Sequence, residues 1–403
     1  MAEFKKNIHI PILLMLVLMN FFELSILNIP GRKAVFTVIL FLLYFLFWKK
    51  LRKSGYFWLV TTYAFAVLGS CIYSNIVNHQ RLLPTIGISY DFWGILIIGY
   101  FLSLKSSGQD YQKIIVYSGV IFCCCYLIQF LVYPFPIFHG AEEDVANVSE
   151  TEGYRVRLPG ALFAYVLAFY SWQRFLLTRK IKCLFYMVLG LLPIIIMGFR
   201  SLTLLTVCSL ILMIPYVLRS FGKTLKWSIL AVLLLVSVSQ IPLVSEKLDN
   251  MEAKQLSGQN FSNKDYIRYL EFYYFYDYVF TKDYELLFGG GAPYKDETPY
   301  ACMVHKDAQE DFNFFWSDLG LVGLAFIIGI PAVVLLIIMV SKSVLRCSIP
   351  QLQFVRFALL TVLIGSLFTT KEIYRAGNLI IMALLIAYEV RVNSTLQIKT
   401  ISK

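Results

Sequence analysis

Long apolar runs constrain the fold of this chain more than any other feature of its sequence. They are roughly 15–25 residues long and lack the amphipathic period of a soluble helix, which is typical of membrane-spanning helices. Hydrophobic residues make up 58% of the 403 residues and charged residues only 15%, whereas a soluble domain has about 25% charged residues. The sequence therefore predicts an all-α, polytopic membrane bundle that forms a single domain over residues 1–403.

Twelve runs are predicted to span the membrane. Their approximate bounds are 8–28, 34–48, 57–77, 90–104, 114–133, 158–174, 183–199, 201–218, 226–244, 314–340, 352–370 and 376–390. No small-residue cleavage site follows the first run, so we interpret it as the first span and not as a signal peptide. Two connecting segments are long: 134–157, and 245–313 between spans 9 and 10.

The basic residues that give the chain its net charge of +11 are distributed unevenly along the sequence. With the N-terminus in the cytoplasm and the sides alternating, twenty of the 36 Lys and Arg residues fall in inner segments, together with only three acidic residues. This asymmetry follows the positive-inside rule for membrane proteins. We therefore expect a multi-pass protein with both termini in the cytoplasm, with the lipid bilayer and not nucleic acid as its partner.

The cysteines and histidines predict neither a disulfide framework nor a metal site. Most of the eight cysteines lie in apolar runs, and the four histidines are scattered along the chain. We expect no metal and no other cofactor.

One arginine stands between two apolar runs. Arg200 follows the run 183–199 and precedes the run 201–218, with no acidic residue nearby in the sequence. A guanidinium group in hydrocarbon costs about 2.5–3.5 kcal/mol on insertion scales. Arg200 therefore either marks the turn of a helical hairpin or is retained because it binds an anionic group.

The two long connecting segments are predicted to lie on the outer side of the membrane. The 134–157 segment has five acidic residues and ends in Arg155 and Arg157. The 245–313 segment has thirteen acidic and seven basic residues, and a connection of this length is usually functional. We therefore expect this segment to have a function of its own.

Within the second segment, Asp265–Phe288 is rich in Tyr and Phe and lacks Gly and Pro. The spacing of its apolar residues predicts an amphipathic helix, with an apolar face formed by Ile267, Leu270, Tyr274 and Tyr278. Anchoring in the membrane interface explains most of these aromatic rings. The alternative is that exposed rings stack on sugars while their hydroxyls bind sugar hydroxyls.

Two further positive charges lie in outer segments. Arg268 is an isolated cation within the predicted aromatic helix, and Arg375 belongs to the last outer loop, Thr369–Ala376. Ordinary interfacial anchoring is one explanation for the charges of that last loop.

Four landmarks of the sequence resemble the integral membrane O-antigen polymerase and O-antigen ligase superfamily (Wzy-like and WaaL-like glycosyltransferases). In order, they are Arg157-Leu158-Pro159-Gly160 before a mid-chain span, Gly198-Phe199-Arg200-Ser201 at a span end, Arg268 followed by Leu287-Phe288-Gly289-Gly290-Gly291, and Asp311-Phe312-Asn313 followed by Asp318-Leu319-Gly320-Leu321-Val322-Gly323. The resemblance covers roughly residues 150–340 and the twelve-span layout. The histidine of the family motif falls on Gln309 here, a departure that favours a polymerase over a ligase.

The resemblance implies the function of a glycosyltransferase in O-antigen (lipopolysaccharide) or capsule polysaccharide biosynthesis. Such an enzyme transfers a glycan from undecaprenyl pyrophosphate to a lipid-linked repeat at the outer, periplasmic face of the bacterial inner (cytoplasmic) membrane. A chain-length regulator protein is a further implied partner.

The resemblance also implies that the 245–313 segment forms part of the catalytic region, and it implies roles for individual residues. Arg200 and Arg268 would stabilise the leaving pyrophosphate, because a guanidinium group binds phosphate oxygens bidentately. Glu310 or Asp311 would deprotonate the acceptor hydroxyl. The remaining candidates for substrate binding are Arg155, Arg157, Arg375, Tyr269 and Tyr273.

Other functions stay open at this point. A ligase would transfer the finished polymer to a lipid A core. A flippase or transporter of lipid-linked glycans would also be polytopic, but it would more often show an internal repeat and paired Gly- or Pro-broken spans. A scaffold protein would explain the spans but not the arginines at outer span ends.

Overall fold

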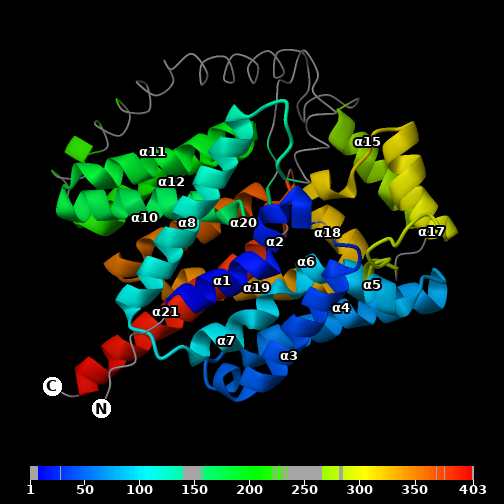
Figure 1. Ribbon diagram of the computed structural model, residues 1–403, viewed down its shortest axis with the longest axis horizontal. Coiled ribbons are helices and arrows are strands. Elements are labelled where there is room, and N and C mark those ends of the chain that lie inside the picture. Colours follow the sequence, from blue (N-terminus) through cyan, green and yellow to red (C-terminus); the bar gives the residue numbers. More distant parts are fainter. Residues whose placement is uncertain are drawn as a thin grey trace.

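The structure is a computed structural model. It describes residues 8–27, 29–138, 156, 158–220, 222, 225–227, 229, 233, 266–280, 285–368, 370–375 and 377–401. The described part of the chain is all-α, as the sequence predicts, with 18 α-helices and several short 3₁₀ and π-helical turns (Figure 1).

Five of these helices are long and apolar enough to cross a membrane. They are α3 (Arg32–Arg52), α4 (Phe57–Val77), α8 (Gly108–Leu131), most of α12 (Arg200–Leu218) and the first part of α21 (Asn378–Ile401). Two bent helix pairs raise the number to seven if each pair is one span: Leu82–Ile88 with Tyr90–Ser103, bent by 63°, and Pro299–Asp311 with Trp316–Ile328, bent by 90°. The protein is thus a multi-pass helical membrane protein with five to seven candidate spans among its described residues.

The first predicted run, 8–28, is not one continuous helix. It forms α1 (His9–Leu18) and then one turn, α2 (Asn20–Glu23), before a 3₁₀ turn at Ser25–Leu27. All four residues of α2 have positive φ, between 48° and 62°, so this turn is left-handed. A left-handed turn costs roughly 1–2 kcal/mol per non-glycine residue, because Cβ approaches the following carbonyl oxygen.

Two other predicted spans are also interrupted. Residues 90–104 form α6 (Tyr90–Trp93), a 3₁₀ turn (Gly94–Ile97) and α7 (Ile98–Ser103), after α5 (Leu82–Ile88). The run 314–340 is divided into α18 (Gly320–Ile328) and α19 (Ile330–Arg346). Gly329 separates these two helices with φ 82° and ψ 154°, a conformation that is essentially restricted to glycine. Most of the predicted span 226–244 lies outside the described residues.

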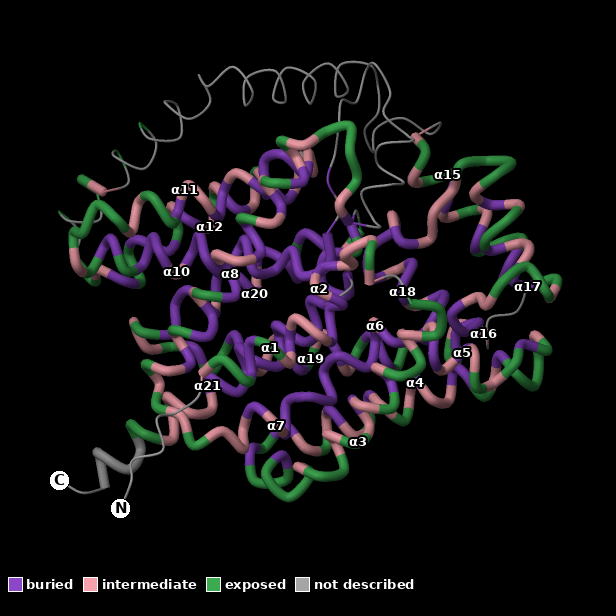
Figure 2. The backbone as a smooth tube through the Cα atoms, in the orientation of Figure 1, coloured by how far each residue is buried: buried purple, intermediate pink, exposed green. Residues whose placement is uncertain are grey.

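Helix α10 (Leu162–Thr178) is almost entirely buried and packs against α8, α11 (Ile181–Ile196), α12 and α20 (Gln353–Gly365). Figure 2 shows that α10, α20 and much of α21 are buried, whereas α3 and α4 expose much of their surface. Helices α10 and α11 approach each other closely at Gly190. A Cβ atom on Gly190 would lie 2.7 Å from the backbone nitrogen of Ala168, so only glycine allows this separation.

A second group of short helices lies at the other end of the molecule from α10–α12 (Figure 1). It contains α15 (Ile267–Tyr273), α16 (Glu285–Phe288) and α17 (Pro299–Ala301), with π-helical turns at Tyr274–Val279 and Cys302–Asp311 and a 3₁₀ turn at Trp316–Leu319. A last 3₁₀ turn, Pro350–Leu352, precedes α20.

The predicted continuous helix over Asp265–Phe288 is wrong in extent and in its buried face. Helix α15 continues as a π-helical turn only to Val279, and α16 is a separate turn. On α15 and its π-helical turn the buried side chains are Glu271, Phe275 and Val279, four residues apart, and Phe280 directly after the turn is also buried. Ile267, Leu270 and Tyr278 of the predicted apolar face are exposed. The difference arises because buried Glu271 has an ion-pair partner, which the apolar pattern alone does not reveal.

Candidate functional site

The loop between α20 and α21, residues 366–377, lies against the start of α18. The backbone oxygen of Ser366 accepts a hydrogen bond from Leu321 N at 2.7 Å. The hydroxyl of the same serine accepts one from Ile373 N at 2.8 Å. Both hydrogen bonds fix the loop, and with it the three residues Glu372, Tyr374 and Arg375, relative to the helices around it.

Arg375 and Glu372 form a buried ion pair in this loop. Arg375 Nη1 lies 2.6 Å from Glu372 Oε1, and the two side chains are only 6% and 0% exposed. Asn378, the first residue of α21, donates a hydrogen bond to the backbone oxygen of Glu372 and accepts one from Leu162 N of α10 at 2.9 Å. Burial lowers the pKa of Arg375, but the charge of Glu372 outweighs this effect, so that the pKa is raised and Arg375 is a buried cation.

Arg375 also reaches the turn that precedes α12. Its Nη1 atom lies 3.4 Å from Met197 Sδ. Met197 follows the end of α11, and Arg200 is the first residue of α12 after Gly198 and Phe199. Arg200 therefore stands at the turn of a helical hairpin, shortly after Met197, which contacts the buried pair. Its side chain lies outside the described part of the structure, and its binding role stays a prediction.

Tyr374 connects the same loop to a second polar cluster. Its hydroxyl lies 3.0 Å from the backbone oxygen of Gly320 and 3.3 Å from that of Ser317. Its ring stacks on Trp316, with 6.0 Å between the ring centroids. These contacts fix the 3₁₀ turn Trp316–Leu319, which carries Asp318.

The second cluster consists of Arg268, Glu271 and Asp318. Arg268 Nη1 donates to Asp318 Oδ2 at 2.6 Å and to the two carboxylate oxygens of Glu271 at 2.8 and 3.0 Å. Phe315 N also donates to Glu271 Oε1 at 3.2 Å. The prediction that Arg268 is an isolated cation is therefore wrong, because two carboxylates neutralise it, one of them fifty residues away in the sequence.

Burial determines the electrostatics of this cluster. It raises the pKa of Glu271 from 4.5 to about 7, and Arg268 opposes this shift only in part. Burial lowers the pKa of Arg268, but Asp318 and Glu271 together outweigh it and raise that pKa. The side chain of Asp318 is 39% exposed and that of Glu271 is 0% exposed, so Asp318 is the carboxylate that an approaching substrate can reach.

Glu271 should make the stability of the protein depend on pH. Because its pKa in the folded state is about 7, above its ordinary value of 4.5, the folded state binds the extra proton between these pH values. Stability should therefore fall as pH rises through this window. We expect Glu271→Gln to remove this part of the decline in stability. The measurement is the thermal unfolding temperature of the purified protein in detergent between pH 5 and 7.5.

The control for this measurement is Glu310→Gln. Glu310 is exposed and forms no ion pair with another described residue, so its substitution should leave the pH dependence unchanged. An unchanged slope in Glu271→Gln would show that Glu271 titrates outside this window.

The other predicted site residues are not brought to the two clusters. Glu310 and Asp311 lie at exposed positions at the end of the π-helical turn Cys302–Asp311. Tyr269 and Tyr273 are exposed on α15. Arg155 and Arg157 lie outside the described residues.

The segment that follows Arg157 nevertheless lies beside the α20–α21 loop. A Cβ atom on Gly377 would be 3.2 Å from Gly160 N. Residues of three of the four sequence landmarks, or their direct neighbours, thus contact this loop. Arg268, of the remaining landmark, pairs with Asp318 on the turn that Tyr374 contacts.

Four residues of this site were not among the predicted site residues: Glu271, Asp318, Glu372 and Tyr374. One sequence signal was available for two of them, because each glutamate lies three residues from an arginine, a spacing that allows a side-chain ion pair on a helix or turn. Nothing in the sequence indicates that Asp318 meets Arg268.

In the described part of the chain, no group of three or more His, Cys, Asp or Glu residues is placed to hold a metal ion. No protein-family model matches the sequence, and no curated protein is significantly similar to it.

Proposed function

We propose that this protein is a membrane glycosyltransferase that polymerises glycan repeats carried on undecaprenyl pyrophosphate. The observation that supports this function best is the role of the α20–α21 loop. Its consecutive residues Tyr374 and Arg375 contact, respectively, the turn that carries Asp318 beside Arg268 and the turn that precedes Arg200. Arg200 and Arg268, which the resemblance associates with a pyrophosphate, thus belong to two segments that contact the same short loop.

The proposed location follows from the positive-inside rule. With twelve spans and both termini in the cytoplasm of a bacterium, the start of α12, the α20–α21 loop and the 245–313 segment all belong to the outer face of the inner membrane. A lipid-linked glycan presents its pyrophosphate at the membrane surface, and these are the segments that would meet it there.

The donor step requires stabilisation of a leaving pyrophosphate. The bond between the anomeric carbon of the donor glycan and a pyrophosphate oxygen breaks, and the electron pair stays with the lipid pyrophosphate. Arg200 is proposed to bind this group, because its permanent charge and planar fork match phosphate oxygens in a poorly hydrated site. Arg375 is already paired with Glu372, and we propose that it positions the turn before Arg200 through its contact with Met197.

The acceptor step requires a base. The acceptor hydroxyl forms the new bond to the anomeric carbon and loses its proton. Glu310 and Asp311 lie apart from both clusters, so we now propose Asp318, which is reachable and lies 2.6 Å from Arg268. Arg268 then orients Asp318, while buried Glu271 positions Arg268.

The decisive experiment uses purified protein in nanodiscs with only the lipid-linked repeat. A polymerase should produce a ladder of lipid-linked products without an added nucleotide sugar, because the pyrophosphate bond supplies the energy. A strain without the gene should display a surface glycan with a single repeat. If that strain instead displays a bare lipid A core and retains long lipid-linked polymer in the membrane, the protein is a ligase. If the purified protein transfers no glycan, both enzyme functions are contradicted and a transporter is favoured.

A further inference from the structure

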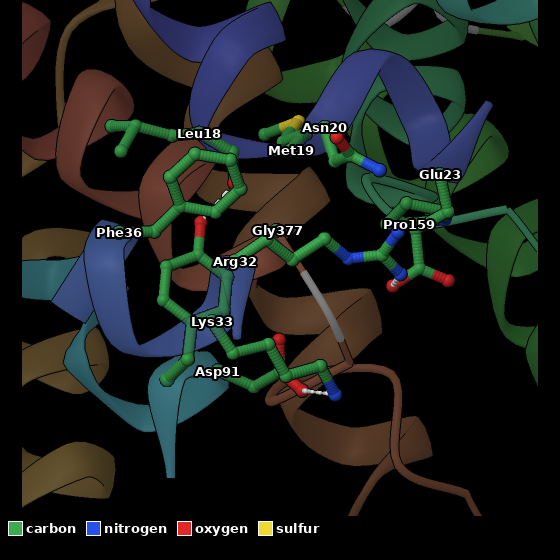
Figure 3. Close-up of a pocket in the computed structure, with 11 residues that line it drawn as sticks. Leu18, Met19, Asn20, Glu23, Arg32, Lys33, Phe36, Asp91, Pro159 and Gly377 are labelled. Atoms are coloured by element: carbon green, nitrogen blue, oxygen red, sulfur yellow. Dashed lines mark hydrogen bonds and ion pairs between the residues drawn. The ribbon is translucent and has the colours of Figure 1, made fainter. Parts of the chain in front are cut away.

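The small pocket beside the α20–α21 loop is neutralised by its own side chains (Figure 3). Arg32 Nη2 lies 3.5 Å from Glu23 Oε1, and Lys33 Nζ lies 4.0 Å from Asp91 Oδ2. These two ion pairs join the start of α3 to α2 and α6, so the pocket is part of the packing between these helices. A more exposed feature lies in the second group of short helices, around α15 and α17 (Figure 1).

Four aromatic side chains of this second group contact one another and form an aromatic ridge: Tyr274, Tyr278, Phe312 and Phe314. The ring centroid of Tyr274 lies 5.9 Å from that of Tyr278, 5.6 Å from that of Phe312 and 5.7 Å from that of Phe314. Phe312 and Phe314 stack on each other with 5.6 Å between their centroids. Tyr278 is 71% exposed and Phe312 is 54% exposed, so the ridge presents large aromatic rings at the protein surface.

Hydrogen bonds hold the ridge in place. The hydroxyl of Tyr274 donates to the backbone oxygen of Met303 at 2.9 Å, and Phe314 N donates to the backbone oxygen of Ala308 at 2.7 Å. The first bond joins the two π-helical turns of this group, and the second fixes the segment that follows them. A surface that is fixed before binding loses little conformational entropy when a ligand arrives.

The charge around the ridge is negative. The two π-helical turns contain four acidic residues, Asp277, Asp307, Glu310 and Asp311, but only one lysine and no arginine. Burial raises the pKa of the Tyr274 hydroxyl, and the charges of Asp307 and Asp311 raise this pKa further. Both carboxylates therefore lie near the central ring of the ridge.

These charges separate the two explanations for exposed aromatic rings on an outer segment. A helix that anchors in the membrane interface has Lys and Arg on its polar face, because anionic headgroups attract them. The same headgroups would repel carboxylates. A sugar, by contrast, has C–H faces that stack on aromatic rings and hydroxyls that donate hydrogen bonds to carboxylates. The combination of exposed rings and carboxylates therefore favours a glycan.

We propose that the aromatic ridge binds a glycan, whose sugars stack on Tyr278 and Phe312 and donate hydrogen bonds to the carboxylates beside these rings. Because like charges repel, the carboxylates would disfavour an acidic sugar at this position. The ridge therefore selects neutral or amino sugars.

The ridge also adjoins the second cluster. Phe315 directly follows Phe314 of the ridge, and its N–H group donates to Glu271 Oε1 at 3.2 Å. The further assignment, that the bound sugars belong to the acceptor that approaches Asp318, rests on the proposed function. Binding of the glycan does not itself require transfer.

The test measures binding of oligosaccharides to the full-length protein in nanodiscs by isothermal titration calorimetry. The probe is the surface glycan of the bacterium that carries the gene, released from its lipid by mild acid and cut into short oligosaccharides. Tyr278→Ala and Phe312→Ala should each raise the dissociation constant by about five- to tenfold, because one stacking face is lost. Asp311→Asn should raise it as well, since it removes a charged acceptor.

Tyr278→Phe and Tyr276→Ala are the matched controls. The first keeps the stacking face and removes only the hydroxyl. The second removes a ring from the same π-helical turn, but this ring stacks on Phe272, outside the ridge, with 5.5 Å between the centroids. Each should change the dissociation constant by less than about twofold, because the ridge keeps all of its stacking faces. Unchanged binding in Tyr278→Ala and Phe312→Ala, or an equal loss in Tyr276→Ala, would overturn the proposal.

Fluorescence quenching by brominated lipids distinguishes a membrane anchor from a glycan site. Tyr278→Trp places a fluorescent ring on the ridge, and in nanodiscs with brominated lipids it should show no more quenching than the wild-type protein. Stronger quenching in this variant, together with unchanged oligosaccharide binding in Tyr278→Ala, would make the ridge a membrane anchor.

The product ladder separates this proposal from the proposed function. Arg200→Ala should lose the ladder but keep oligosaccharide binding. If the wild-type protein gives no ladder and its oligosaccharide binding still depends on Tyr278 and Phe312, the polymerase is contradicted and the glycan site stands. A normal ladder with unchanged binding in both alanine variants of the ridge would keep the polymerase and remove the glycan site.

Discussion

Replacing Arg375 by alanine is expected to lower the free energy of unfolding by about 3–5 kcal/mol, the usual cost of leaving one partner of a buried ion pair without the other. Glu372 would then stay fully buried with no cation beside Oε1, and its Oε2 atom already has no hydrogen-bond partner among the described residues. The measurement is unfolding of the purified protein in mixed micelles with increasing SDS.

Two further variants separate this effect from a general loss of packing. Glu372→Gln with Arg375→Met removes both charges and keeps most of the volume, so it should recover much of the stability lost in Arg375→Ala. Arg81→Ala breaks the exposed ion pair of Arg81 with Glu297, in which Nε lies 3.2 Å from Oε2, and should cost at most about 1 kcal/mol. Equal costs for Arg375→Ala and Arg81→Ala would mean that the Arg375–Glu372 pair is solvated and contributes little.

Replacing Arg200 by alanine is expected to reduce polymer formation by about 100- to 1,000-fold, the range found when one charge-stabilising donor is removed from an active site. The reason is that the proposed leaving group is a pyrophosphate, and Arg200 is the cation that we place against it. Arg200→Lys should restore only part of the activity, because an ammonium group cannot form the bidentate contact of a guanidinium. The ladder assay with the lipid-linked repeat measures both variants.

Arg219→Ala is the control for this series. Arg219 is the C-cap of the same helix, so the variant removes the same type of side chain from the opposite end of α12. It should leave the product ladder intact at equal protein level. Normal polymer in Arg200→Ala would identify Arg200 as an anchor at a hairpin turn and would remove it from the mechanism.

The sequence by itself determined that this is an all-α membrane protein. The length and apolarity of a run such as Arg32–Arg52 depend only on consecutive residues, and so does the basic asymmetry that predicts sidedness. The position of Arg200 at the end of an apolar run was likewise visible. Such properties are local, because the bilayer acts on each segment independently of how the segments later pack.

The tertiary structure alone decided which charges distant in the sequence meet. Arg268 pairs with Asp318 and not with Glu310 or Asp311, because Tyr374 fixes the turn that carries Asp318 against the α20–α21 loop. Arg375 reaches Met197, 178 residues away, because α20, α21 and α12 converge there. The left-handed turn at Asn20–Glu23 was also invisible in the apolar pattern. Long-range ion pairs and strained turns depend on contacts between distant segments, and no local period of the sequence encodes those contacts.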